Sequence, residues 1–128
     1  MGVRSFWQEI QKLRGPKYGS VVLDEVQSMK TSVCRTLVAD ILEPATMDYD
    51  GTICAFFTPS ASASGYAFEI DHEGQAWERF HWTMLDNPHL PKAAEWLEQR
   101  KQENNWDEST PVFRREYLGE WIHDEETL

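Results

Sequence analysis

The sequence contains no apolar run close to the roughly 20 residues that a membrane-spanning helix requires, and its first residues lack the uninterrupted apolar core of a secretion signal. Cysteine is scarce: Cys34 and Cys54 are the only two among 128 residues, which excludes a disulfide-dense secreted scaffold. Basic residues are also few, since 12 Lys and Arg stand against 22 Asp and Glu. The resulting net charge of −10 argues against a freestanding DNA-binding protein, which has a basic face. We therefore expect a cytoplasmic protein with no membrane partner and two buried, reduced thiols.

Two further patterns are missing. No segment reads Gly-x-x-x-x-Gly-Lys-[Ser/Thr], the loop that holds the β- and γ-phosphates of a nucleotide in P-loop enzymes. The four histidines are spaced too irregularly for a compact zinc site, and nothing beside Cys34 suggests a nucleophile pair. We interpret Cys34 as a core thiol and the histidines as ordinary surface or half-buried residues; they are His72, His81, His89 and His123.

The residues that are present indicate one folded α/β domain over residues 1–128. Hydrophobic residues make up 41% of the chain and aromatic residues 12%, too many for a disordered segment. In the first half, apolar spacing predicts a helix, a strand, a second helix and a second strand at Val3–Leu13, Val21–Leu23, Val33–Leu42 and Thr52–Phe57. Pro44 is expected to close the second helix, and Asp48–Gly51 to form a turn.

The second half predicts one more strand. A small-residue loop, Ser60–Gly65, leads into a helical turn at Tyr66–Ile70. Residues Trp77–Met84 then alternate as a strand does, with Arg79 and His81 facing one way and Phe80 and Trp82 the other.

Two helices are expected to follow. Pro91 opens the first, which runs to about Asn104 and carries Ala94, Leu97 and Lys101 on one stripe. Thr110-Pro111 opens the second, and the acidic end of the chain, Asp124–Glu126, is expected to be exposed. Four tryptophans could stack on bases, but in so acidic a chain they are expected to pack against the helices or to fill the seam to missing parts; they are Trp77, Trp82, Trp96 and Trp121.

The most informative segment is Ser20–Glu25, because a short apolar strand ends there in two adjacent carboxylates. Continuous apolar residues are typical of strands covered on both faces, as in parallel sheets. If the strand at Thr52–Phe57 lies beside it, Thr58 reaches the same sheet edge as Asp24 and Glu25, the edge where such sheets bind ligands. One acid would then hold Mg²⁺ through water and the next would orient an attacking water. Alternatively, the two acids merely begin the next helix, where they favour its positive dipole.

Four segments in order carry the signature of a family: residues Leu13–Gln27, Thr58–Phe68, Thr83–Pro91 and Phe113–Trp121. They resemble parts of the ATPase domain of phage terminase large subunits, the motors that pump viral DNA into capsids. In order, these parts are the Walker B strand with its Asp-Glu-x-Gln continuation, the Gly-Thr-Pro coupling segment with the next helix, the Asn-Pro turn and the closing helix. The closing segment is the most distinctive match.

The resemblance implies a partial P-loop NTPase domain of the ASCE, RecA-like class, with a short parallel sheet flanked by helices. It implies that Asp24 helps to hold Mg²⁺, that Glu25 is the catalytic carboxylate, and that Thr58 belongs to the cofactor-binding motif that senses the γ-phosphate. ATP and Mg²⁺ would be the cofactors of the complete protein. Its partners would be a nuclease domain, a small terminase subunit, a capsid portal and double-stranded DNA.

Two departures from the family shape the expectation. Phe57 stands where the family has the glycine before Thr-Pro, which changes the local geometry at Thr58. The P-loop and the nuclease acids are absent, so we expect the second half of an ATPase domain, whose N-terminal segment and nuclease domain are missing. Such a chain alone is expected neither to bind ATP tightly nor to hydrolyse it. One alternative is a non-catalytic prophage remnant or interaction module. Another is a piece of a different P-loop enzyme such as a helicase, against which the Asn87-Pro88 turn and the Phe113–Trp121 ending argue by their resemblance to the terminase family.

Overall fold

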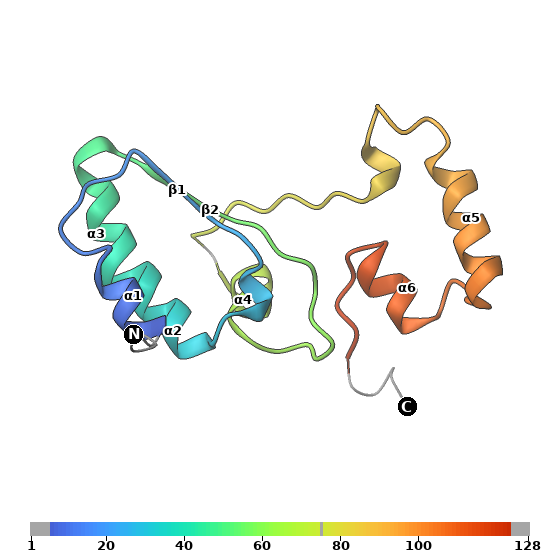
Figure 1. The fold of residues 1–128 in the computed structure, drawn as a ribbon, viewed down its shortest axis with the longest axis horizontal. Coiled ribbons are helices and arrows are strands. Elements are labelled where there is room, and N and C mark those ends of the chain that lie inside the picture. The colour runs from blue at the N-terminus through green and yellow to red at the C-terminus, as the bar shows by residue number, and fades with distance from the viewer. Residues whose placement is uncertain (1–5, 75, 124–128) are drawn as a thin grey trace, which may run out of the picture. The chain divides into compact units, whose positions relative to one another are not determined.

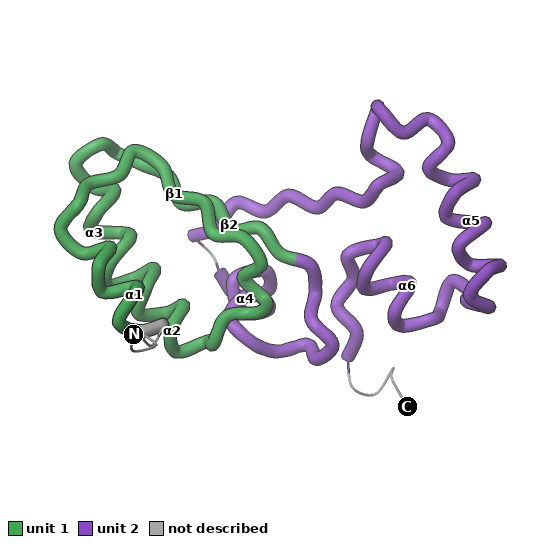
Figure 2. The backbone as a smooth tube through the Cα atoms, in the orientation of Figure 1, with its two compact units in different colours: residues 1–57 green, residues 58–128 purple. Residues whose placement is uncertain are grey.

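The structure is a computed structural model that describes residues 6–74 and 76–123. The chain divides into two compact units, residues 1–57 and residues 58–128 (Figure 2), and each is described by itself below. No helix among the described residues is both long and apolar enough to cross a membrane.

Unit 1 alternates short helices with two strands (Figure 1). Its elements are α1 (Phe6–Gln11), β1 (Ser20–Leu23), the 3-10 turn η1 (Val26–Ser28), α2 (Thr31–Thr36), the π-helical turn η2 (Leu37–Leu42), α3 (Glu43–Thr46), the 3-10 turn η3 (Met47–Tyr49) and β2 (Thr52–Ala55). The predicted first helix, Val3–Leu13, begins at residues that lie outside the described part of the chain, and α1 ends at Gln11, two residues before the predicted end. The predicted turn at Asp48–Gly51 overlaps η3, which ends at Tyr49, and Asp50 just after it has the left-handed conformation.

The second helix does not end at Pro44, which corrects the prediction from sequence. Helical backbone continues from Thr31 through Thr46, and Pro44 lies in the first turn of α3. The π-helical turn just before it explains why, since Glu43 donates its N–H to Val38, five residues back. This wider turn makes room for the proline ring and does not need the N–H that proline lacks.

The two strands lie side by side and run parallel, as predicted, with Ser20 opposite Thr52 and Leu23 opposite Ala55. Burial alternates along both strands, so the expectation that they are covered on both faces is wrong. Val22 is 63% exposed, and Cys54, opposite it, is also exposed rather than buried. Helices cover only one face of this two-stranded sheet, and the other face meets solvent.

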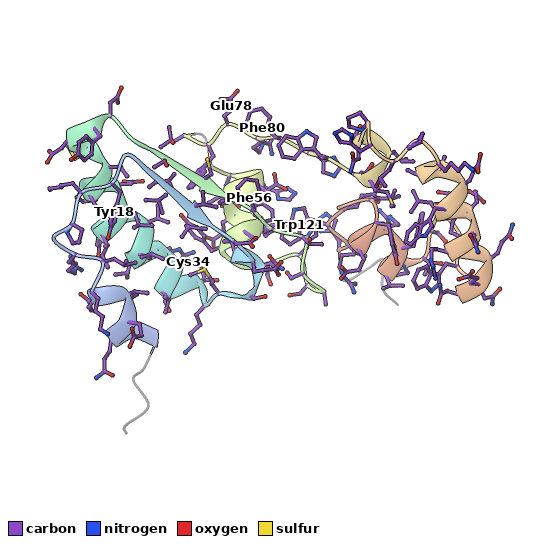
Figure 3. All side chains as sticks on the ribbon, turned by 45° about the horizontal axis from the view of Figure 1, so that its top comes forward. Tyr18, Cys34, Phe56, Glu78, Phe80 and Trp121 are labelled. Atoms are coloured by element: carbon purple, nitrogen blue, oxygen red, sulfur yellow. The ribbon has the colours of Figure 1, made fainter. Side chains whose placement is uncertain are left out.

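The core of unit 1 joins that covered face to the helices. Its buried members are Ile10, Leu37, Ile41 and Leu42, and the partly buried residues packed against them are Leu13, Val21, Leu23, Met29, Val33 and Ile53. Helical spacing places Leu37 and Ile41 on one face. Cys34 (labelled in Figure 3) is 1% exposed, which confirms the prediction of a core thiol.

Unit 2 contains helices but no strand among its described residues. The helices are α4 (Tyr66–His72), the 3-10 turn η4 (Met84–Asp86), α5 (Ala93–Asn104) and α6 (Pro111–Glu116). The strand predicted at Trp77–Met84 is therefore wrong. Helix α5 begins at Ala93 rather than Pro91, and its buried stripe is Ala93, Leu97 and Lys101, whereas Ala94 is exposed.

The last described residues of unit 2 pack against α4. Helix α6 ends at Glu116, so the predicted closing helix is shorter than Phe113–Trp121. Beyond it, the Trp121 ring meets the Phe68 ring edge-on at 5.2 Å, and its indole N–H donates to Asp71 Oδ2 at 2.7 Å (Figure 3). Trp121 thus packs on a helix as expected, whereas Trp82 is 64% exposed and does not. The acidic end at Asp124–Glu126 lies outside the described residues.

Gly51, just before β2, lies close to the backbone of Gly19, just before β1, and substitution of each glycine tests this close approach. A Cβ on Gly51 would lie 2.6 Å from the Gly19 carbonyl oxygen, whereas a Cβ on Gly19 would meet nothing within 4 Å. We expect Gly51→Ala to lower the free energy of unfolding by about 1–3 kcal/mol, because backbone has to move. Gly19→Ala is the matched control, with a change within about 0.5 kcal/mol. Urea unfolding of both variants measures the difference, and equal values would contradict the close approach.

Candidate functional site

The candidate site lies where β1 and β2 end. The pairing continues one step past both strands: the Phe56 N–H donates to the Leu23 carbonyl at 2.8 Å, and the Val26 N–H donates to the Phe56 carbonyl at 3.2 Å. Val26 is fully buried at 0% exposed. Asp24 and Glu25 are therefore held between two fixed residues at the carboxyl edge of the sheet, as the sequence predicts.

The backbone turns sharply at the second acid. Glu25 has φ 55° and ψ 42°, in the left-handed region that non-glycine residues rarely adopt. The acids do precede a helix, but it is the single 3-10 turn η1, with Glu25 at its N-cap and no side-chain cap hydrogen bond, and α2 begins only at Thr31. Strained conformations of this kind are often found at functional sites.

Hydrogen bonds orient both carboxylates. Asp24 Oδ1 accepts the Glu25 N–H at 2.9 Å, and Glu25 Oε2 accepts from the Gln27 amide nitrogen at 2.7 Å. Within the described chain, Asp24 Oδ2 and Glu25 Oε1 accept no hydrogen bond, and both side chains are exposed. Each acid thus presents one oxygen to an incoming group.

The two open carboxylate oxygens are suited to Mg²⁺, which needs few protein ligands, and less suited to a metal ion that only protein side chains coordinate. In residues 6–74 and 76–123, no group of three or more His, Cys, Asp or Glu side chains is placed to hold a metal ion. Mg²⁺ keeps several of its waters and is held by one or two carboxylates together with substrate phosphates. The pair of acids after β1 offers that kind of partial ligand set.

Thr58, the third predicted site residue, belongs to unit 2, whereas Asp24 and Glu25 belong to unit 1. It follows Phe56 by two residues, is half-buried and precedes the buried Pro59. The structure therefore holds the two adjacent acids at one sheet edge, and Thr58 is the first residue of the other unit. The small-residue loop after it is held by its own hydrogen bonds, such as Ser60 Oγ to the Ser62 carbonyl at 2.8 Å.

The histidines and Cys34 have ordinary surroundings. His72 stacks on Phe68 with ring centroids 4.1 Å apart, and His81 Nε2 lies 2.9 Å from the Leu118 carbonyl oxygen. Burial raises the pKa of the Cys34 thiol, which keeps it protonated and unreactive.

One charged cluster was not recognised from the sequence. Lys101 lies on the buried stripe of α5, 8% exposed, with its ammonium paired to Glu98 and Glu108 and 5.4 Å from the centre of the Phe113 ring. The hydrogen bond to Glu108 is the largest cause that raises the Lys101 pKa, and the hydrogen bond to Glu98 is the next largest. A lysine on an apolar stripe was the signal that a partner had to lie nearby. The arrangement ties α5 to the loop before α6.

Two substitutions of Glu25 test its backbone conformation. Glu25→Gly and Glu25→Ala both remove the carboxylate and the Gln27 hydrogen bond. We expect the glycine variant to be more stable by about 1 kcal/mol, because a Cβ disfavours the left-handed conformation. At Glu95, an exposed position in α5, the same pair should show the opposite order by about 1 kcal/mol. Thermal unfolding compares the four variants, and an alanine variant more stable than glycine at both positions would contradict the conformation.

The Lys101 cluster predicts a dependence of stability on pH. A pKa raised above the ordinary 10.5 means that the cluster stabilises the fold fully below pH 10.5 and loses this contribution as the pH rises through the folded-state pKa. We expect the stability difference between the wild type and Lys101→Met to fall above pH 10.5, because methionine does not titrate. Urea unfolding from pH 8 to pH 12 measures it. A difference that stays constant over this range would show that the ion pairs contribute nothing.

Comparison of the chain with models of protein families, with curated proteins and with solved structures found no match.

Proposed function

We propose that this chain supplies the Walker B carboxylates of a phage terminase large subunit, the ATP-driven motor that packages viral DNA inside a bacterial host cell. The observation that carries the proposal is the parallel pair β1–β2, with Asp24 and Glu25 fixed at its carboxyl edge. Parallel sheets bind nucleotides at this edge. The chain that leaves β2 beside these acids continues into Thr58-Pro59, the predicted coupling segment.

Each acid has its own task in this proposal. Asp24, with its open Oδ2, would hold Mg²⁺ through the ion's water shell, and Glu25, with its open Oε1, would orient the attacking water. Bound Mg²⁺ neutralises charge on the phosphates of ATP. The Gln27 hydrogen bond and the left-handed backbone fix the direction of the Glu25 carboxylate before any nucleotide arrives. Catalysis of phosphoryl transfer by a protein depends mainly on such preorganisation.

The proposal requires phosphate-binding groups from another segment. Two carboxylates with no P-loop beside them repel a triphosphate, and the net charge of −10 adds to that repulsion. A segment bearing the P-loop, the nuclease domain, a small terminase subunit, a portal and double-stranded DNA are the proposed partners. Alone, the chain is proposed to be inactive as an ATPase.

A non-catalytic interaction module is the second candidate function. Phe57 in place of the family's glycine favours it, and so do the large apolar side chains on the surface, such as Val22 at 63% and Phe80 at 67% exposed. Exposed apolar groups of this size mark binding surfaces when they gather. The two candidates differ in whether Asp24 meets a divalent cation.

Binding of Mn²⁺, a paramagnetic substitute for Mg²⁺, tests the Walker B assignment. We expect Mn²⁺ to broaden the backbone NMR signals of residues 23–27 and Phe56, with an affinity on the order of 1 mM, typical of weak carboxylate sites. Asp24→Asn should weaken this binding at least about tenfold by removing the negative charge that holds the hydrated cation. Asp48→Asn, an exposed acid of the same unit, is the matched control and should leave it unchanged.

Two outcomes would contradict the proposal in different ways. Broadening centred away from residues 23–27, or unaltered in Asp24→Asn, would remove the Walker B role and favour the interaction module. Hydrolysis of ATP by the purified chain that disappears in Glu25→Gln would show instead that the phosphate-binding groups need not come from another segment.

A further inference from the structure

Residues 78–82 of unit 2 form an extended segment whose peptide groups have no partner within the described chain. The last backbone hydrogen bond before them is from the Trp77 N–H to Gly74, and the next joins Asp86 to Thr83. In residues 6–74 and 76–123, no N–H or C=O of residues 78–82 is hydrogen-bonded. The sequence predicts a strand here, and the structure has the extended chain without a neighbour to pair with.

Odd-numbered side chains tie this segment to the rest of unit 2. Arg79 donates to the Asp71 carbonyl and lies 3.8 Å from Asp71 Oδ1. The His81 ring lies 2.9 Å from the Leu118 carbonyl oxygen. Gly119, with φ +64°, leaves room for that ring, since a Cβ there would come within 2.9 Å of Nε2. The segment is thus anchored along one side.

Even-numbered side chains face the opposite way. Phe80 is 67% and Trp82 is 64% exposed, and their rings stack on each other with centroids 5.8 Å apart and planes 14° from parallel. Residues two apart point to the same face only in a strand-like backbone. Glu78 is the next residue in this alternation (Glu78 and Phe80 are labelled in Figure 3). The free side of the segment therefore presents a carboxylate and two aromatic rings in line.

We propose that residues 78–82 bind an extended segment of a partner protein by β-strand pairing, and that this segment alternates Lys or Arg with apolar residues. Unpaired peptide groups would form the ladder, and alternate side chains would give specificity. Basic side chains complement Glu78 and the net charge of −10, and they also bind the faces of Trp82 and Phe80 by cation–π interaction.

Charge also disfavours the other occupants. Arg79 is the only Lys or Arg in residues 76–90 and is engaged by Asp71, so the surface offers no cation to nucleic acid phosphates. A second copy of the chain would set Glu78 near its own equivalent and bring two net charges of −10 together. A basic protein segment is the occupant that this surface favours.

The probe is a synthetic peptide, acetyl-Lys-Val-Lys-Val-Lys-Val-Lys-amide, titrated into the full chain and followed by NMR. We expect saturable shifts of the backbone signals of residues 78–82. The double variant Phe80→Ser/Trp82→Ser should weaken binding at least about tenfold. Met47→Ser is the matched control, because Met47 is 74% exposed and lies in unit 1, and it should not change binding. Glu78→Lys should weaken binding about threefold or more and reduce its sensitivity to salt.

A peptide N-methylated at every residue separates strand pairing from charge attraction, since it keeps the lysine side chains but has no backbone N–H on either edge with which to form the ladder. We expect it to bind at least about tenfold more weakly than the parent peptide. Equal binding of both peptides overturns the proposal in favour of simple ionic attraction. Shifts of residues 78–82 with a twelve-nucleotide oligo-dT but not with the peptide overturn it in favour of nucleic acid. Self-association that depends on Phe80 and Trp82, without peptide binding, overturns it in favour of a second copy.

Discussion

The position of the candidate site depends on the register between β1 and β2. With Leu23 opposite Ala55, the chain beyond β1 stays paired through Phe56, and buried Val26 closes the turn that carries the two acids. A shift by one residue would move Val21 and Leu23 out of the core and bring Val22 into it. Because Leu37, Ile41 and Leu42 fill one side of the sheet, the core fixes the register, and the register fixes where Asp24 and Glu25 emerge.

Local patterns in the sequence predicted the elements better than their surroundings. The strands β1 and β2 and the helix through Leu37–Leu42 followed from apolar spacing, which a single segment contains, and the parallel direction of the strands followed from the helical crossover between them. Whether a strand is covered on one face or two depends on how many layers surround it, and no local pattern in Val21–Leu23 states this. The helix ran past Pro44 because a π-helical turn preceded it, and such turns have no simple sequence signal.

The same distinction applies to the candidate site and to unit 2. The order of strand and acids placed Asp24 and Glu25 correctly, but the left-handed backbone of Glu25 and its contact with Gln27 are conformational details that side-chain type does not reveal. In Trp77–Met84 the alternation was real, as the opposite directions of Arg79 and Phe80 indicate. A ladder needs a second strand as well, and pairing between distant segments is not written in either one alone.

The exposed side of the sheet gives the chain two thiols of unlike accessibility. Cys34 is buried and has a raised pKa, whereas Cys54 is exposed opposite Val22. A maleimide dye or spin label would therefore attach at one known place, in the middle of β2, without any engineered cysteine. A reporter there sits two residues before Phe56 and senses events at the strand end that bears the acids.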